Sequence, residues 1–95
     1  GYRAMFVLLD SYYRNGYTTI RKIIVRYAPP IKNHTENYIR WVCEWSGIGA
    51  DTPLNPQRGE LMLPVVAAMS RVENGIPAVL ADVQAGWNLY LTHKP

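Results

Sequence analysis

Thr19-Ile-Arg-Lys-Ile-Ile-Val-Arg-Tyr-Ala-Pro-Pro30 is the stretch that decides the fold of this chain. Its β-branched run, residues 23–25, is compatible with a strand or with a helix. Charged residues at positions 21, 22 and 26 break the alternation of a half-buried strand, whereas apolar residues at 20, 23, 24 and 27 follow helical spacing. We therefore predict a helix that Thr18 or Thr19 caps through its hydroxyl and that Pro29-Pro30 ends.

Outward from this stretch, four more segments show the same helical spacing of apolar residues, at about 2–15, 35–46, 60–73 and 78–91. Gly16 suits a left-handed cap, and Gly47 and Gly75 end the next two segments. Pro64 favours a start near Leu63 for the fourth helix, because proline is tolerated in a first turn. The expected fold class is all-α: a compact bundle of about five helices, with residues 48–59 as its longest loop.

The third segment decides the expected binding face. Tyr38, Trp41, Val42 and Trp45 recur at helical spacing, and we expect them to share one face. Two N-terminal caps are possible for this helix. Asn33 and Glu36 fit a capping box loosely, and Thr35 is an equally good cap. Elsewhere, Ile24 and Val66 are expected in the core, since each belongs to an apolar stripe.

Length and composition limit the classes of protein. The 95 residues form one domain, 1–95, with 48% apolar and 18% charged residues. The net charge of +3 comes from scattered Lys and Arg residues, which disfavours a nucleic-acid partner. One cysteine and two histidines predict no metal site, and no phosphate-binding loop or cofactor motif is present. No apolar run approaches 18 residues, so no membrane span is expected.

A complete catalytic site is not visible in the sequence. Glycoside hydrolysis requires one or two carboxylates around a sugar bond, one of them with a raised pKa. Glu44 precedes Trp45, but neighbouring positions lie about 100° apart around a helix, so we expect a solvated Glu44. Asp10 and Glu36 are expected on polar faces or at a cap. The catalytic residue is therefore not identified within this chain.

Several spaced motifs resemble those of a family of phage and prophage proteins that are often labelled virion structural proteins. The motifs are Gly1-Tyr-Arg-Ala-Met-Phe6, Thr19-Ile-Arg-Lys-Ile-Ile24, Tyr27-Ala-Pro-Pro30, Asn33-His-Thr-Glu-Asn-Tyr-Ile39 and Val66-Ala-Ala-Met-Ser-Arg-Val-Glu-Asn-Gly75. Members usually begin with an Arg-Gly-Ile-Arg-Asn-Asn-Asn-Pro segment that this chain lacks. The resemblance implies that the chain is the C-terminal part of a longer bacterial prophage or virion protein.

A more distant resemblance is to lytic transglycosylases, in which an early helix carries the catalytic Glu and a later helix opens with Glu-Thr-x-x-Tyr-Val. Thr35-Glu-Asn-Tyr38-Ile occupies a similar place, although Glu36 follows Thr35 and Pro29-Pro30 replaces the usual glycines of the preceding turn. The resemblance implies that Tyr38 lines a sugar cleft. Trp41 is the second candidate substrate-binding residue, because indole rings suit sugar faces. An ordinary core role for Tyr38 is the open alternative.

Two functions follow from these resemblances. In the first, the chain belongs to a phage lysozyme-like protein that cleaves peptidoglycan glycan strands; it is similar to the C-terminal helical half of a lysozyme-like domain, and the catalytic acid lies upstream. In the second, it is a non-catalytic virion structural or cell-wall-binding domain. The apolar stripe of the helix at 2–15 is expected to be uncovered if upstream residues have been lost, and self-association could then cover it.

Overall fold

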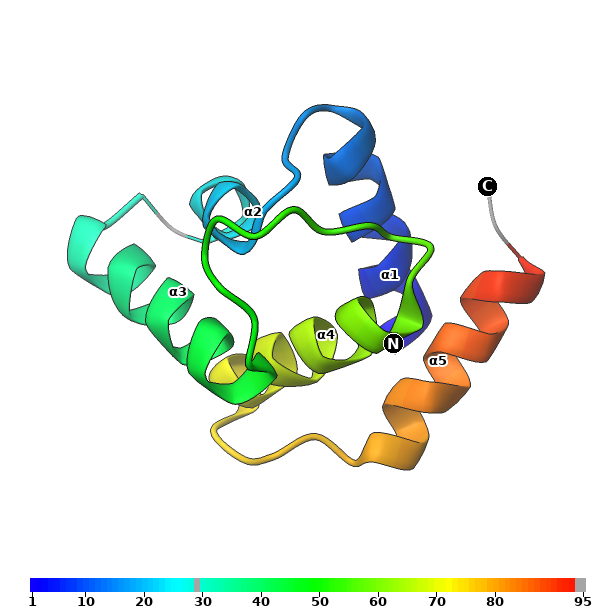
Figure 1. The fold of residues 1–95 in the computed structure, drawn as a ribbon. Helices are drawn as coiled ribbons and strands as arrows, with labels where there is room; N and C mark the ends of the chain where they lie inside the picture. The colour runs from blue at the N-terminus through cyan, green and yellow to red at the C-terminus, as the bar shows by residue number, and fades with distance from the viewer. Residues whose placement is uncertain (29, 94–95) are drawn as a thin grey trace.

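Five helices make up the part of the chain that the structure, a computed structural model, describes: residues 1–28 and 30–93. They are α1 (Tyr2–Arg14), α2 (Ile20–Tyr27), α3 (Lys32–Ser46), α4 (Gly59–Asn74) and α5 (Leu80–Thr92), shown in Figure 1. No strand occurs in these ranges, and the predicted all-α bundle is confirmed. Pro29, one half of the predicted break after the second helix, lies outside the described residues.

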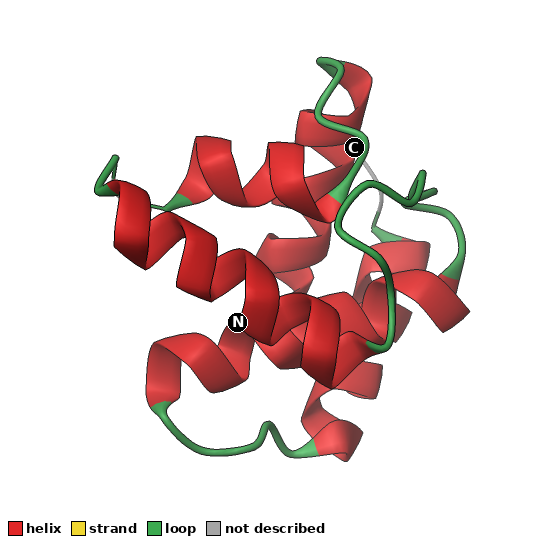
Figure 2. Cartoon of the chain, turned by 60° about the vertical axis from the view of Figure 1, so that its left-hand side comes forward, coloured by secondary structure: helices red, strands yellow, loops and turns green. Residues whose placement is uncertain are grey.

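The central element is α4, which packs against α3 on one side and against α1 and α5 on the other (Figure 1). The short α2 packs against α3. One core unites all five helices and the 47–58 connection, and both Ile24 and Val66 are fully buried in it, as predicted. The loops run around the outside of the helices (Figure 2).

The deciding stretch is helical because local and tertiary preferences agree. The Thr19 hydroxyl accepts a hydrogen bond from the backbone N–H of Lys22 at 3.2 Å, which confirms one of the two predicted caps. Ile20, Ile23 and Ile24 face the core, whereas Val25 is exposed. The 47–58 connection is tied to the start of α2 by two backbone hydrogen bonds, from Leu54 N to Thr18 O and from Arg21 N to Ala50 O. If the same stretch were a strand paired into a sheet, the charged residues that lie between these isoleucines in the sequence would be buried.

The predicted caps of the third helix are wrong. The helix begins at Lys32 after Ile31, and no side chain caps it. The hydroxyl of Thr35 donates instead to the carbonyl of Ile31 at 3.2 Å, one turn back. A threonine hydroxyl inside the first turn can satisfy a backbone carbonyl in this way, so the same residue type that suits a cap also fits the helix itself.

The start near Leu63 predicted for the fourth helix is also wrong. The helix begins at Gly59 and continues through Pro64, which lies in its second turn. Met62 is buried and Leu63 packs against the core, and this burial offsets the hydrogen bond that proline cannot donate. Glu60 in the first turn also interacts favourably with the positive end of the helix dipole.

The apolar stripe of α1 is covered, contrary to the expectation of an uncovered first helix. Phe6 and Leu9 are buried, and Phe6 makes an edge-to-face contact with Trp87 of α5 at a ring-centroid distance of 5.1 Å. Helices α4 and α5 supply this cover from the same chain. The most exposed aliphatic side chains lie instead around the start of α5: Ile76, Val79 and Leu80.

Candidate functional site

Tyr38 and Trp41, the two predicted substrate-binding residues, lie in different environments. Tyr38 is 6% exposed, and its ring packs in the core beside Tyr27. Its hydroxyl donates to a carboxylate oxygen of Glu73 on α4 at 2.9 Å. Trp41 is 40% exposed and Trp45 is 36% exposed, so the predicted face shared with Tyr38 and Val42 is wrong for both indoles. The face that α3 buries consists of Tyr38, Ile39 and Val42.

Trp41 and Trp45 form a stacked aromatic surface on the exposed side of α3. They lie one helical turn apart, with ring centroids 6.2 Å apart and planes within 7° of parallel. The guanidinium carbon of Arg71, from α4, lies 4.0 Å from the centroid of the Trp45 ring. Parallel, partly exposed indoles offer apolar faces to a ligand, and the arginine adds positive charge beside them.

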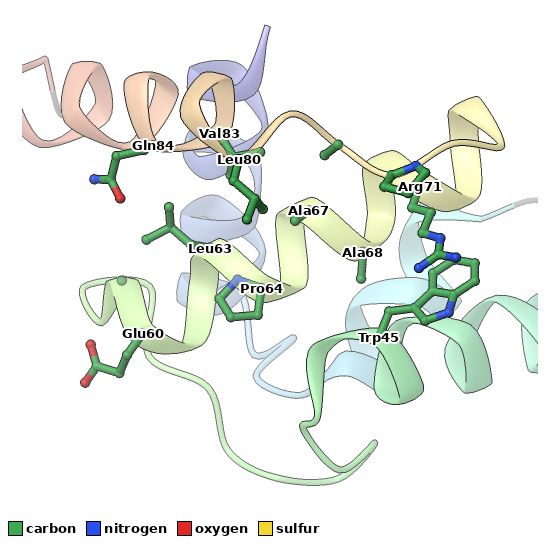
Figure 3. Close-up of a pocket in the computed structure, with 13 residues that line it drawn as sticks. Trp45, Glu60, Leu63, Pro64, Ala67, Ala68, Arg71, Leu80, Val83 and Gln84 are labelled. Atoms are coloured by element: carbon green, nitrogen blue, oxygen red, sulfur yellow. The ribbon is translucent and has the colours of Figure 1, made fainter.

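A groove of about 650 Å³ begins at this Trp45–Arg71 pair and runs along α4 towards the first turns of α5. Its volume is in the range of small-molecule sites, roughly 300–1,000 Å³. Figure 3 shows Pro64, Ala67 and Ala68 along α4, with Leu63 and Leu80 facing the same space from α4 and α5. This groove was not predicted from the sequence, because its walls come from three successive helices and the 75–79 connection, and no single segment contains their packing.

Polar groups are few in the groove and lie mainly at its two ends. Arg71 is at one end, and Glu60 and Gln84 are at the other (Figure 3). Arg58 donates to the Glu60 carboxylate at 2.6 Å. The pKa of Glu60 is lowered, first by a hydrogen bond from its own backbone N–H and then by Arg58. Glu60 is therefore a stable carboxylate and lacks the raised pKa of a general acid.

The other acids that the sequence singled out are also paired or exposed. Tyr90, buried on α5, donates to the Asp10 carboxylate at 3.2 Å, and Arg14 lies 3.7 Å from the same group. Glu36 lies 3.9 Å from Arg21. Glu44 is exposed, as predicted. Within residues 1–28 and 30–93, no group of three or more potential ligands could hold a metal ion, and no helix is long and apolar enough to cross a membrane.

Glu73 is the acid that the sequence analysis missed. It follows Val72 in the last turns of α4 and was not singled out, because its own neighbours in sequence predict only an exposed helix end. The fold places it against Tyr38, 35 positions earlier in the chain. A buried tyrosine hydroxyl therefore orients this carboxylate, and the burial of the ring fixes the direction of the hydroxyl.

Tyr38→Phe is expected to change the stability of the protein most clearly at high pH. Burial, followed by the hydrogen bond to Glu73, raises the pKa of Tyr38 far above the ordinary value of 10.0. The unfolded chain releases this proton near pH 10 while the folded chain keeps it, so wild-type stability falls as the pH rises above 10. The phenylalanine variant should lose about 0.5–1.5 kcal/mol at pH 8 and show a shallower decline above pH 10.

Urea unfolding at pH 8 and pH 11 measures both effects, with Tyr13→Phe at an exposed position of α1 as the matched control. Burial also raises the pKa values of Tyr27 and Tyr90, so the decline is reduced and not abolished in the variant. An identical decline in wild type and Tyr38→Phe would contradict the buried, protonated state of Tyr38.

The chain is similar to a phage protein. Over 94 residues it is 36% identical to Protein P5 of Pseudoalteromonas phage PM2; the match includes 95% of this chain and 57% of that protein. The chain thus corresponds to little more than half the length of this relative. The similarity supports a phage-associated protein, in agreement with the coarser part of the sequence interpretation. No protein-family model matches the chain, and no solved structure matches it.

Proposed function

We propose that the chain is part of a phage-associated protein that acts on bacterial peptidoglycan, and that Trp41 and Trp45 bind the glycan strand. The parallel, partly exposed indoles are the observation that carries this proposal, because pyranose rings pack their C–H faces on such surfaces. The similarity to a phage protein supports it, since phages must pass the cell wall of their host. The net charge of +3 favours an anionic cell-wall polymer.

The catalytic acid, in this proposal, belongs to a part of the whole protein outside these 95 residues. Asp10 and Glu36 each form an ion pair with an arginine, and the pKa of Glu60 is lowered, whereas a general acid must hold its proton near neutral pH. The domain would then supply one wall of the cleft. Tyr38 contributes from behind this wall by fixing α3, which carries both indoles, against α4.

Binding of the purified chain to chitotetraose and to insoluble peptidoglycan tests the proposal. Trp41→Ala should weaken binding by about 3- to 10-fold, the equivalent of about 0.5–1.5 kcal/mol for an aromatic contact. Tyr13→Ala, which removes a similarly exposed ring from α1, is the matched control and should leave binding unchanged. Equal binding by Trp41→Ala and wild type would contradict the indole surface as the glycan site.

The same chain should not cleave peptidoglycan on its own, because it lacks the proposed acid. Release of soluble fragments from cell walls is the measurement, and a full-length parent protein is the positive control. Robust cleavage by this chain would contradict an acid outside it. Glu73, which contacts Tyr38, would then be the first carboxylate to replace by glutamine.

A virion structural role is the second candidate function. The exposed aliphatic side chains of Ile76, Val79 and Leu80 favour it, because clustered apolar residues at a surface are typical of protein contacts. This candidate predicts no affinity for glycan. A chain that binds neither chitotetraose nor peptidoglycan, with both indoles intact, would favour the structural role.

A further inference from the structure

We infer that the groove between α4 and α5 binds the peptide stem of peptidoglycan, with a stem carboxylate placed at Arg71. This inference rests on the proposed glycan-binding function and adds to it the part of the substrate that the groove would recognise. The stem is attached to the glycan strand, and the groove begins at Trp45, within the aromatic surface that would hold the sugar. A ligand with both parts could therefore occupy the two surfaces together.

Arg71 supplies the charge complementarity. Its guanidinium stacks on Trp45, and no carboxylate within the described ranges forms an ion pair with it, whereas Arg14, Arg21 and Arg58 each have an acidic partner. The side chain is half-buried and held by the indole, so its donors are already oriented (Figure 3). A fixed guanidinium at the edge of an apolar groove favours a carboxylate, which it can bind through two parallel hydrogen bonds.

The walls of the groove fit the rest of the stem. Stem peptides carry alanine methyl groups between their carboxylates, and the walls are formed largely by Leu63, Pro64, Ala67 and Leu80. The small side chain of Ala67 lets a peptide backbone approach α4 closely. A free sugar, which presents hydroxyl groups on its rim, would leave those groups unpaired against this surface. The groove therefore suits the peptide better than the glycan.

At Pro64, which lines the groove, α4 lacks one of its regular backbone hydrogen bonds. Pro64 has no N–H and cannot donate to the carbonyl of Glu60, four residues earlier in the helix, and both residues line the groove. From Pro64 to Arg71 the helix rises about 10 Å, at roughly 1.5 Å per residue. Three residues of extended peptide cover about the same length, at roughly 3.3 Å per residue. A tripeptide stem thus has the length of the stretch of groove between Pro64 and Arg71.

Isothermal titration of the purified chain with three soluble probes tests the inference. The probes are chitotetraose, a disaccharide–tripeptide fragment of peptidoglycan, and the same fragment with its carboxylates amidated. We expect the stem-bearing fragment to bind about tenfold more tightly than chitotetraose, as for one charge-assisted hydrogen-bonded pair, and amidation to remove most of this gain. Arg71→Met should remove the same gain, so that the stem-bearing fragment binds this variant no more tightly than chitotetraose does.

Two further variants separate the groove from general effects. Arg26→Met removes another arginine that lies over an aromatic ring, 5.8 Å from Tyr12, and should not change any affinity. Ala67→Leu narrows the groove at its wall without removing charge, and should also weaken the stem-bearing fragment selectively. Circular dichroism confirms that each variant is folded; if Arg71→Met is not, Ala67→Leu alone decides.

The possible outcomes distinguish this inference from the proposed function. Equal affinity for the stem-bearing fragment and chitotetraose, unchanged in Arg71→Met, would overturn the stem site and leave the glycan surface in place. Binding of the stem-bearing fragment without binding of chitotetraose would contradict the glycan surface and support the groove. Binding of none of the probes would overturn both.

Discussion

Gly86→Ala is expected to destabilise the protein by about 1–3 kcal/mol, although alanine is the better helix former. Gly86 lies in the middle of α5, where alanine would otherwise add about 1 kcal/mol of helix stability. A Cβ atom at this position would lie 2.5 Å from the Cβ of Tyr2 and 2.9 Å from the backbone nitrogen of Arg3. The backbone of α1 would have to move, and α1 and α5 would separate.

Chemical denaturation and a thermal melt measure this effect, with Gly59→Ala as a graded comparison. A Cβ at Gly59 would meet only side-chain atoms, 3.0 Å from Leu63 and 3.1 Å from Trp87, which can adjust by small rotations. Gly59→Ala should therefore cost less than Gly86→Ala. A Gly86→Ala variant as stable as wild type would show that α1 and α5 do not approach as closely as described.

Ile24→Ala is expected to destabilise the protein by about 2–5 kcal/mol, the usual cost of truncating a fully buried aliphatic side chain. Ile24 is 0% exposed and belongs to the eight-residue α2, which holds its place through three isoleucines. A domain of this size has a stability of roughly 5–14 kcal/mol. Ile24→Ala alone therefore removes a large part of the free energy of unfolding of the domain.

Val25→Ala is the matched control for Ile24→Ala. The two residues are neighbours on α2, but Val25 is 59% exposed, so its truncation should change the free energy of unfolding by no more than about 0.5 kcal/mol. Urea denaturation of both variants measures the difference. If the two variants were equally stable, the assignment of the buried face of α2 would be wrong.

The candidate site was only partly predictable from the sequence. Trp41 was predicted as a substrate-binding residue from the chemistry of its indole, but neither its exposure nor its pairing with Trp45 was predicted. The apolar residues of α3 span a wider face than a neighbouring helix can cover, so part of that face stays exposed. The packing of α4 against α3 buries Tyr38 and leaves Trp41 exposed. No pattern within residues 35–46 specifies how the two helices pack.

By itself, the sequence determined the elements whose cause is local. Charges at positions 21, 22 and 26 excluded a strand in the deciding stretch, and the hydroxyl of Thr19 set its start. Glycine alone adopts positive φ without strain, and Gly16, Gly47 and Gly75 all do so where the first, third and fourth helices end. These features depend on neighbours within a few residues, so periodicity and turn chemistry were sufficient to predict them.

Only the tertiary structure decided the features that join distant residues. Packing carried α4 through Pro64, whose local preference is to begin a helix, because the burial of Met62 outweighs a lost hydrogen bond. Gly86 is a weak helix former, but only a residue without a Cβ atom fits against α1 at this position. The Tyr38–Glu73 hydrogen bond and the placement of Arg71 over Trp45 depend equally on how α3 and α4 meet. The physical reason is that each is a property of two surfaces in contact, and a single segment of sequence specifies only one of them.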